Sequence, residues 1–187
     1  MCIRDSAKIK HRLSDWTVQK RKHTAEEYFV VTGVHPCLGT NIKFKSYSFP
    51  ETNDGRHALT AYVGHWAVVN VHLESGSKGM KARKAQIEQI AQWHEHDECR
   101  SQKAVIVAGD CNMRSGEDYT MRLEGWHDAG ANQHQTQEWT WKVGENCDRY
   151  DRVFFRGQQQ CILHCTSYDL LAEVWPKLTD HVALCLS

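Results

Sequence analysis

The chain has 187 residues, which is enough to bury one sizeable core and favours a single domain over residues 1–187. Its 23 Lys and Arg side chains balance its 23 Asp and Glu side chains, which excludes a global basic field, so any nucleic-acid binding must be local. No apolar stretch of 18 residues and no apolar signal-peptide core occurs, so we expect an intracellular protein, cytoplasmic or nuclear, without a membrane span.

Strand-like patterns dominate the first part of the chain. The run 28–32 is apolar and β-branched, and apolar residues recur among polar ones over 42–49. Two further runs, 58–63 and 66–72, are joined by Gly64-His65, and glycine at the first position of a two-residue loop suits a type II′ turn. We therefore predict a hairpin over residues 57–73 that brings His72 to its far end.

A helix and three more strands are predicted after the hairpin. Over residues 80–96, Ile87, Ile90, Ala91 and His94 recur at helical spacing, which predicts an amphipathic helix that packs on a sheet. The apolar run 104–109 comes next as a buried strand, giving the strand, helix, strand order of an α/β unit. Residues 150–155 and 182–186 supply further strands.

The eight cysteines are scattered, with no secretory lead and no CxxC pair, so we expect reduced thiols rather than disulfides. Cys161 and Cys165 flank His164, but a structural zinc site requires a second pair of ligands. Strand packing is therefore the preferred interpretation of these residues.

The most informative stretch is Gly109-Asp110-Cys111-Asn112, at the end of the buried strand, together with Thr179-Asp180-His181 near the C-terminus. Side chains just past the end of such a strand project into a cleft at the sheet edge. Hydrolysis of a phosphodiester requires an activated water, a cation and donors to the phosphate oxygens, which a carboxylate, an amide and an imidazole suit. The alternatives are ordinary: a turn after a strand, a core histidine at His72, and a local ion pair at Asp151-Arg152.

Five short motifs occur in the order seen in the endonuclease/exonuclease/phosphatase superfamily. They are His72-Leu73-Glu74-Ser75, Gly109-Asp110-Cys111-Asn112-Met113-Arg114, Thr140-Trp141, Asp151-Arg152-Val153-Phe154-Phe155-Arg156 and Thr179-Asp180-His181. Over roughly residues 28–187 the chain resembles this superfamily, and within it the 5′-tyrosyl-DNA phosphodiesterase branch. The resemblance implies a two-sheet α/β sandwich of the DNase I-like type and a metal-dependent phosphodiesterase that acts on nucleic acid, with a role in DNA repair.

The resemblance also implies catalytic roles for five residues. Asp110 would orient and activate water as a general base, and Asn112 would donate its amide to the phosphate or the nucleophile. His181 would donate to the scissile phosphate, and Asp151 would hold that imidazole in orientation. His72 corresponds to a position near the leaving group, where a general acid would help.

Metal and substrate contacts are implied for four more residues. Asp180 would coordinate Mg²⁺, with Mn²⁺ as the alternative metal. Arg83 and Arg114 are candidates for binding DNA phosphates, and Trp141 for packing against a nucleotide or a tyrosyl ring. The ordinary alternatives are a solvated helix residue for Arg83 and a core side chain for Trp141.

Two motifs of the superfamily are absent from the sequence: an early strand bearing Asn, and a Gln-Glu motif whose glutamate is the principal metal ligand. Residues 9–16 resemble the segment that comes directly after the Gln-Glu motif, and residues 1–6 fit nothing in the family pattern. We therefore expect an N-terminally truncated domain in which residues 1–6 are foreign to the original gene. Loss of the glutamate would weaken Mg²⁺ binding, so we expect impaired activity from this chain alone.

Other functions fit the same motifs, because the core motifs set the reaction and the loops select the substrate. A sphingomyelinase-like lipid phosphodiesterase, an inositol polyphosphate phosphatase and a general nuclease are alternatives within the fold. From a different class, the chain could be a non-catalytic module that binds phosphate or DNA with a strong dependence on salt.

Overall fold

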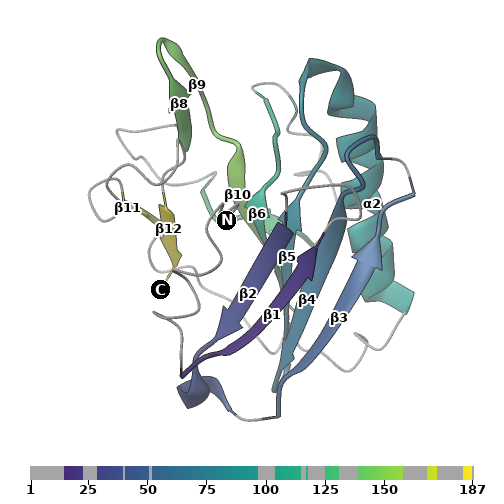
Figure 1. Ribbon diagram of the computed structural model, residues 1–187, viewed down its shortest axis with the longest axis vertical. Coiled ribbons are helices and arrows are strands. Elements are labelled where there is room, and N and C mark those ends of the chain that lie inside the picture. Colours follow the sequence, from purple (N-terminus) through teal and green to yellow (C-terminus); the bar gives the residue numbers. More distant parts are fainter. Residues whose placement is uncertain are drawn as a thin grey trace.

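The computed structural model describes residues 15–22, 29–39, 41–50, 52–96, 104–114, 117, 125–130, 139–157, 168–171 and 183–186. Their centre is a six-stranded sheet in the spatial order β3-β4-β5-β6-β10-β7 (Figure 1). Its strands are β3 (Lys43–Ser48), β4 (His57–Val63), β5 (Trp66–His72), β6 (Ala104–Asp110), β10 (Asp151–Gly157) and β7 (His127–Asp128). The β5–β6 pair is parallel and the other neighbouring pairs are antiparallel, so the sheet is mixed.

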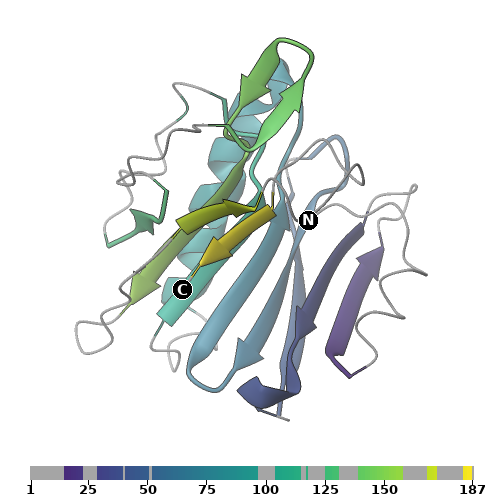
Figure 2. The same ribbon diagram turned by 90° about the vertical axis from the view of Figure 1, so that its left-hand side faces the viewer.

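Three two-stranded sheets and one long helix complete the described structure. The small sheets are β1 (Thr17–Lys22) with β2 (Phe29–Val34), β8 (Trp141–Val143) with β9 (Asn146–Asp148), and β11 (Tyr168–Leu171) with β12 (Ala183–Leu186). The helix α2 (Met80–His96) connects β5 to β6, and two short 3₁₀ helices, η1 (Pro36–Leu38) and η2 (Ser77–Gly79), lie in loops. In Figure 2 the β8–β9 hairpin projects beyond the end of the six-stranded sheet.

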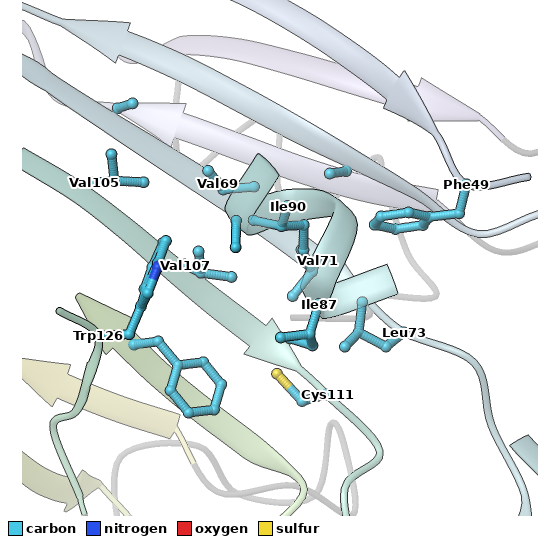
Figure 3. Close-up of a cluster of buried hydrophobic side chains, with 14 of the residues drawn as sticks. Phe49, Val69, Val71, Leu73, Ile87, Ile90, Val105, Val107, Cys111 and Trp126 are labelled. Carbon is cyan, nitrogen blue, oxygen red and sulfur yellow. The ribbon is translucent and has the colours of Figure 1, made fainter. Parts of the chain in front are cut away.

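Helix α2 covers one face of the sheet, as its apolar spacing predicts. Ile87 and Ile90 pack against the valines of β5 and β6, including Val69, Val71 and Val107, in the cluster shown in Figure 3. These three valines are between 0% and 2% exposed. Full burial of such a side chain is worth about 1.5–3 kcal/mol, so this face carries much of the hydrophobic stabilisation.

The β1–β2 pair lies on the opposite face, where it contacts β4 and β5. Side chains alternate along a strand, so Asn70 of β5 faces away from the helix-covered neighbours Val69 and Val71. Its Nδ2 donates to the carbonyl of Val31 (2.7 Å) and to the Thr32 hydroxyl (3.1 Å) in β2. The sheet therefore has a helix on one face and a second strand layer on the other.

The elements predicted by apolar periodicity are confirmed, with boundaries shifted by a few residues. The helix spans residues 80–96, and the β4–β5 hairpin turns at Gly64, whose φ is +58° as the first position of a type II′ turn requires. Apolar patterns did not predict β1, whose TVQKRK sequence has one apolar residue, or the short β8 and β9. Pairing with β2 compensates for the polar composition of β1.

Cys111 lies in the core behind the end of β6, whereas Cys37 and Cys147 are exposed free thiols. Burial raises the pKa of Cys111 far above its ordinary value, and the negative charge of Asp110 adds to the shift. The Cys111 thiol therefore stays protonated and acts as a small apolar core residue. Within the described part of the chain, no helix combines the length and the apolar character needed to cross a membrane.

Candidate active site

Three of the residues predicted to be catalytic lie side by side where three neighbouring strands of the six-stranded sheet begin or end. His72 ends β5 and pairs in register with Asp110, which ends β6. Asp110 in turn pairs with Asp151, the first residue of the antiparallel strand β10. Both carboxylates are buried, at 6% and 9% exposure. The sheet thus brings two carboxylates and an imidazole from distant parts of the chain to one place.

Gly109 explains how closely β5 and β6 approach at this edge. Its φ is +143°, and a Cβ built there would lie only 2.0 Å from the Val71 carbonyl oxygen. No other residue fits this backbone position, because any side chain begins with that carbon. The glycine of the Gly-Asp motif therefore sets the strand spacing that places His72 beside Asp110.

The Asp110 carboxylate has a different partner at each oxygen. Its Oδ2 lies 3.4 Å from the His72 Nε2, and its Oδ1 accepts the backbone N–H of Asn112 at 2.9 Å. The backbone continues the pairing of β5 and β6, because the Leu73 N–H donates to the Asp110 carbonyl at 2.9 Å. These contacts fix the carboxylate in one orientation.

Asn112 is held by both its backbone and its side chain. It has a φ of +50°, in the left-handed region that asparagine tolerates better than most residues. Its side-chain Nδ2 donates to the Leu73 carbonyl at 3.0 Å, which joins the loop after β6 to the loop after β5. The Gly-Asp-x-Asn sequence therefore forms a turn, and this turn closes over the end of the sheet.

Thr140 positions Asp151. The Thr140 side chain is fully buried, and its hydroxyl accepts the Asp151 backbone N–H at 2.9 Å. The Thr140 N–H donates to the Asp148 carbonyl at 3.0 Å, so the residue bridges the start of β8 and the start of β10. The threonine of the Thr-Trp motif has a structural role that was not predicted from the motif itself.

An aromatic pair lies next to these carboxylates. Trp141 stacks on Tyr150 with ring centroids 5.0 Å apart and an interplanar angle of 30°. Burial raises the pKa of Tyr150, and the positive charge of the exposed Arg114 opposes this shift. Trp141, a predicted substrate-binding residue, therefore contacts Tyr150, which was not predicted as a site residue although it directly precedes Asp151.

A second buried charge cluster supports the start of β10. The Asp128 carboxylate is fully buried and accepts from Arg149, from the Arg152 Nη1 (3.1 Å) and from the Gly130 N–H (2.8 Å). The Arg152 Nε also donates to the Arg149 carbonyl at 2.7 Å. Asp128 thus holds the turn that precedes Asp151, a role that no local pattern in the sequence indicated.

The prediction that Arg83 binds DNA phosphates is wrong. Its side chain is fully buried, and its Nε and Nη2 donate to the two carboxylate oxygens of Glu117 at 2.8 Å and 2.7 Å. The interpretation as a solvated helix residue is wrong for the same reason. The spacing of Arg83, Ile87 and Ile90 puts all three on one face of α2, and this spacing is the signal that could have placed Arg83 in the core.

His181 and Asp180, which the sequence predicts as phosphate donor and metal ligand, lie outside the described residues. Among the residues that the structure describes, no group of three or more His, Cys, Asp or Glu side chains is arranged to hold a metal ion.

No protein-family model and no curated protein sequence matches the chain. Solved structures do. Truncated Caenorhabditis elegans TDP2 is 21% identical with a TM-score of 0.72, and the match covers 97% of this chain and 78% of that one. For D. rerio TDP2 complexed with single strand DNA product, the identity is 19%, the TM-score 0.77, and the coverage 98% and 82%. An endonuclease/exonuclease/phosphatase from Bacteroides vulgatus is 18% identical with a TM-score of 0.69, over 97% and 80% of the two chains.

The chain spans 60% of another C. elegans TDP2 structure, so that protein contains regions with no counterpart here. The similarity extends over nearly the whole of this chain in each comparison above, and it includes the sheet that carries His72, Asp110 and Asp151. It confirms the DNase I-like α/β fold predicted from the motifs: the chain has the fold of the endonuclease/exonuclease/phosphatase proteins, and its described residues form one six-stranded and three two-stranded sheets.

Proposed function

We propose that this protein is a member of the 5′-tyrosyl-DNA phosphodiesterase branch and hydrolyses the phosphodiester that links tyrosine to a 5′ end of DNA. The observation that carries the proposal is the alignment of His72, Asp110 and Asp151 across three neighbouring strand ends. Two structures of similar fold are TDP2 proteins, and one of them contains a single-stranded DNA product. The fold and the aligned residues together support this chemistry over that of a passive binding module.

Asp110 is the proposed general base. Its carboxylate is buried and fixed at both oxygens by His72 and Asn112, which meets the requirement that a catalytic base be held in place. Asn112 and His181 are the proposed donors to the phosphate oxygens, and Asp151 the residue that orients His181. A tyrosine leaving group departs as a phenolate, so proton donation by His72 contributes less here than it would for an alkoxide.

Mg²⁺ is the proposed metal. It prefers oxygen ligands and is commonly held by one or two protein carboxylates together with waters. Asp180 is the proposed metal ligand. When bound, Mg²⁺ neutralises the charge that develops on the phosphate oxygens.

Arg114 and the Trp141–Tyr150 pair are the proposed substrate contacts. An exposed guanidinium can bind a DNA phosphate, and stacked rings offer a surface for a nucleobase or a tyrosyl ring. Tyr150 directly precedes Asp151 in the chain, which supports a role for this aromatic pair in binding the substrate.

The test is hydrolysis of a 5′-phosphotyrosyl oligonucleotide by the purified chain, with Mg²⁺ and with EDTA. We expect slow cleavage that depends on Mg²⁺ and that EDTA abolishes. Asp110→Asn should lower the rate by about 100-fold or more, since the amide cannot accept a proton. The control is Glu88→Gln, which changes an exposed carboxylate paired with Lys84 and should cleave normally.

Cleavage of sphingomyelin or an inositol phosphate, with no cleavage of the phosphotyrosyl bond, would contradict the proposed substrate and support a lipid or inositol phosphoesterase of the same fold. Salt-sensitive DNA binding with no turnover of any of these substrates would contradict it and support the binding-module alternative.

A further inference from the structure

We infer that Arg83 is a positioning residue for this site: with Glu117, it holds the loops after β5 and β6 in the arrangement that places Asn112 and Arg114 at the Asp110 strand end. The effect of Arg83 on catalysis rests on the proposed function. The positioning of the two loops by Arg83 does not rest on it, because the loops and their contacts are defined without a substrate.

All three guanidinium nitrogens of Arg83 are occupied. The Nε and Nη2 form the two-pronged pair with Glu117, and the Nη1 donates to the carbonyls of Glu74 (2.9 Å) and Gly76 (2.8 Å). Two parallel hydrogen bonds to one carboxylate fix the direction of approach as well as the distance. A buried guanidinium with these four contacts locks together every group that it touches.

These partners belong to the two loops that form the site. Glu74 and Gly76 come after His72 in the loop after β5, and Glu117 comes after Asn112 in the segment after β6. The Glu117 N–H donates to the Arg114 carbonyl at 2.9 Å, so holding Glu117 also holds the backbone at Arg114. Arg83 therefore joins the loops from the helix side, while the Asn112 contact with Leu73 joins them at the sheet edge.

Gly79 provides the space for the guanidinium. A Cβ built on Gly79 would lie 2.7 Å from the Arg83 Nη1 and 3.2 Å from the Glu74 Cγ. A larger residue would push the guanidinium away from its partners without removing any charge. The fit between Gly79 and Arg83 shows that the local backbone is shaped around this side chain.

Folding stability alone does not explain why the chain has a buried Arg83–Glu117 ion pair. Well-packed apolar residues commonly replace a buried ion pair with little loss of stability, or with a gain. What apolar side chains cannot replace is the directional link between four separate backbone and side-chain acceptors. The contribution of Arg83 is therefore expected in the geometry of the site more than in the stability of the fold.

The experiment compares the wild-type chain with Arg83→Met/Glu117→Met, Arg83→Lys and Gly79→Ala, using the phosphotyrosyl oligonucleotide. We expect kcat to fall about tenfold or more in all three variants, with KM changed less than about threefold, because misplacement by an ångström costs rate. Arg83→Lys should not restore kcat, because a lysine cannot form two parallel hydrogen bonds to the Glu117 carboxylate. The control is Ile90→Ala, which destabilises the same helix through the core and should retain kcat at a temperature where it is folded.

Amide hydrogen exchange gives a readout that needs no activity. In the Met double variant, the Asn112 and Glu117 amides, which donate to the Asp110 carboxylate and the Arg114 carbonyl, should exchange at least tenfold faster, and β3–β4 amides should not change. Retention of kcat and of exchange protection would overturn the inference. If the wild-type chain cleaves nothing, the proposed function fails, and unchanged exchange in the variant would then overturn the positioning role independently.

Discussion

Two buried ionic clusters hold the strand ends that form the site, and they differ in charge. In the α2 cluster, Arg83 pairs with Glu117, one positive charge against one negative. In the β7 cluster, Asp128 pairs with both Arg149 and Arg152, which leaves an excess of one positive charge. The neutral cluster supports the loops after β5 and β6, and the positive one supports the start of β10.

The two clusters also differ in where they lie relative to Asp110 and Asp151. Arg152 pairs in register with Gly109, directly beside Asp110, and Asp151 precedes it in the chain. Arg152 lowers the pKa of Cys111, whereas Asp110, Asp151 and Asp128 raise it. The β7 cluster therefore brings both charges of the Arg152–Asp128 pair beside the two carboxylates, whereas the α2 cluster holds the loops after β5 and β6.

The largest expected effect is on stability, from Asp128→Ala. Removing the carboxylate leaves two mostly buried arginines without their shared partner, which should lower the free energy of unfolding by about 3–5 kcal/mol. Glu117→Gln should cost less, about 1–3 kcal/mol, because Arg83 keeps the carbonyls of Glu74 and Gly76. Urea denaturation measures both values, and Glu88→Gln on the surface should change them by less than about 1 kcal/mol. An equal or reversed order would contradict the difference between the two clusters.

An intermediate effect is expected on substrate binding, from Trp141→Ala, because Trp141 stacks on Tyr150, the residue that follows Arg149 of the β7 cluster. Loss of the stacking surface should raise the KM for the phosphotyrosyl oligonucleotide by about fivefold or more, since base stacking is worth about 1–3 kcal/mol. Trp66→Ala is the matched control, because Trp66 is 41% exposed and begins β5, at the opposite end from His72. If the two variants had the same KM, the aromatic pair would have no part in substrate binding.

The smallest expected effect concerns Cys111, which directly follows Asp110 at the end of β6. The thiolate is the reactive form, and the raised pKa of Cys111 keeps it protonated, so iodoacetamide should leave it unmodified in the folded protein. The exposed Cys37 and Cys147 should react. Peptide mass spectrometry distinguishes the sites. Modification of Cys111 at a similar rate would show that the core behind Asp110 opens.

Local patterns predicted the parts of this fold that depend on local physics. The helix at 80–96 and the β4–β5 hairpin result from apolar spacing and from the glycine turn, and both form where the sequence places them. The strand ends at His72, Asp110 and Asp151 could be found from motif order, but their side-by-side register depends on strand pairing between distant segments. That pairing had to come from the structure.

The role of Arg83 was mispredicted because its partner is distant in sequence. A basic residue in a polar-looking helix resembles a phosphate ligand until Glu117, 34 residues away, is seen to meet it. The same limit applies to Asp128, whose arginine partners lie 21 and 24 residues further along the chain. Helical spacing can place Arg83 on the buried face of α2, but it cannot identify a partner that is distant in the sequence.

The left-handed backbone at Asn112 has a consequence for the evolution of this protein. A glycine would adopt a φ of +50° without steric cost, so the chain gives up a little folding free energy to keep an amide at that position. Under the proposed function, in which this amide donates to the phosphate, catalysis and an unstrained backbone are opposed at this residue. A lineage released from selection for catalysis would be expected to accept glycine here early, and retention of asparagine in related chains would report that the chemistry is still in use.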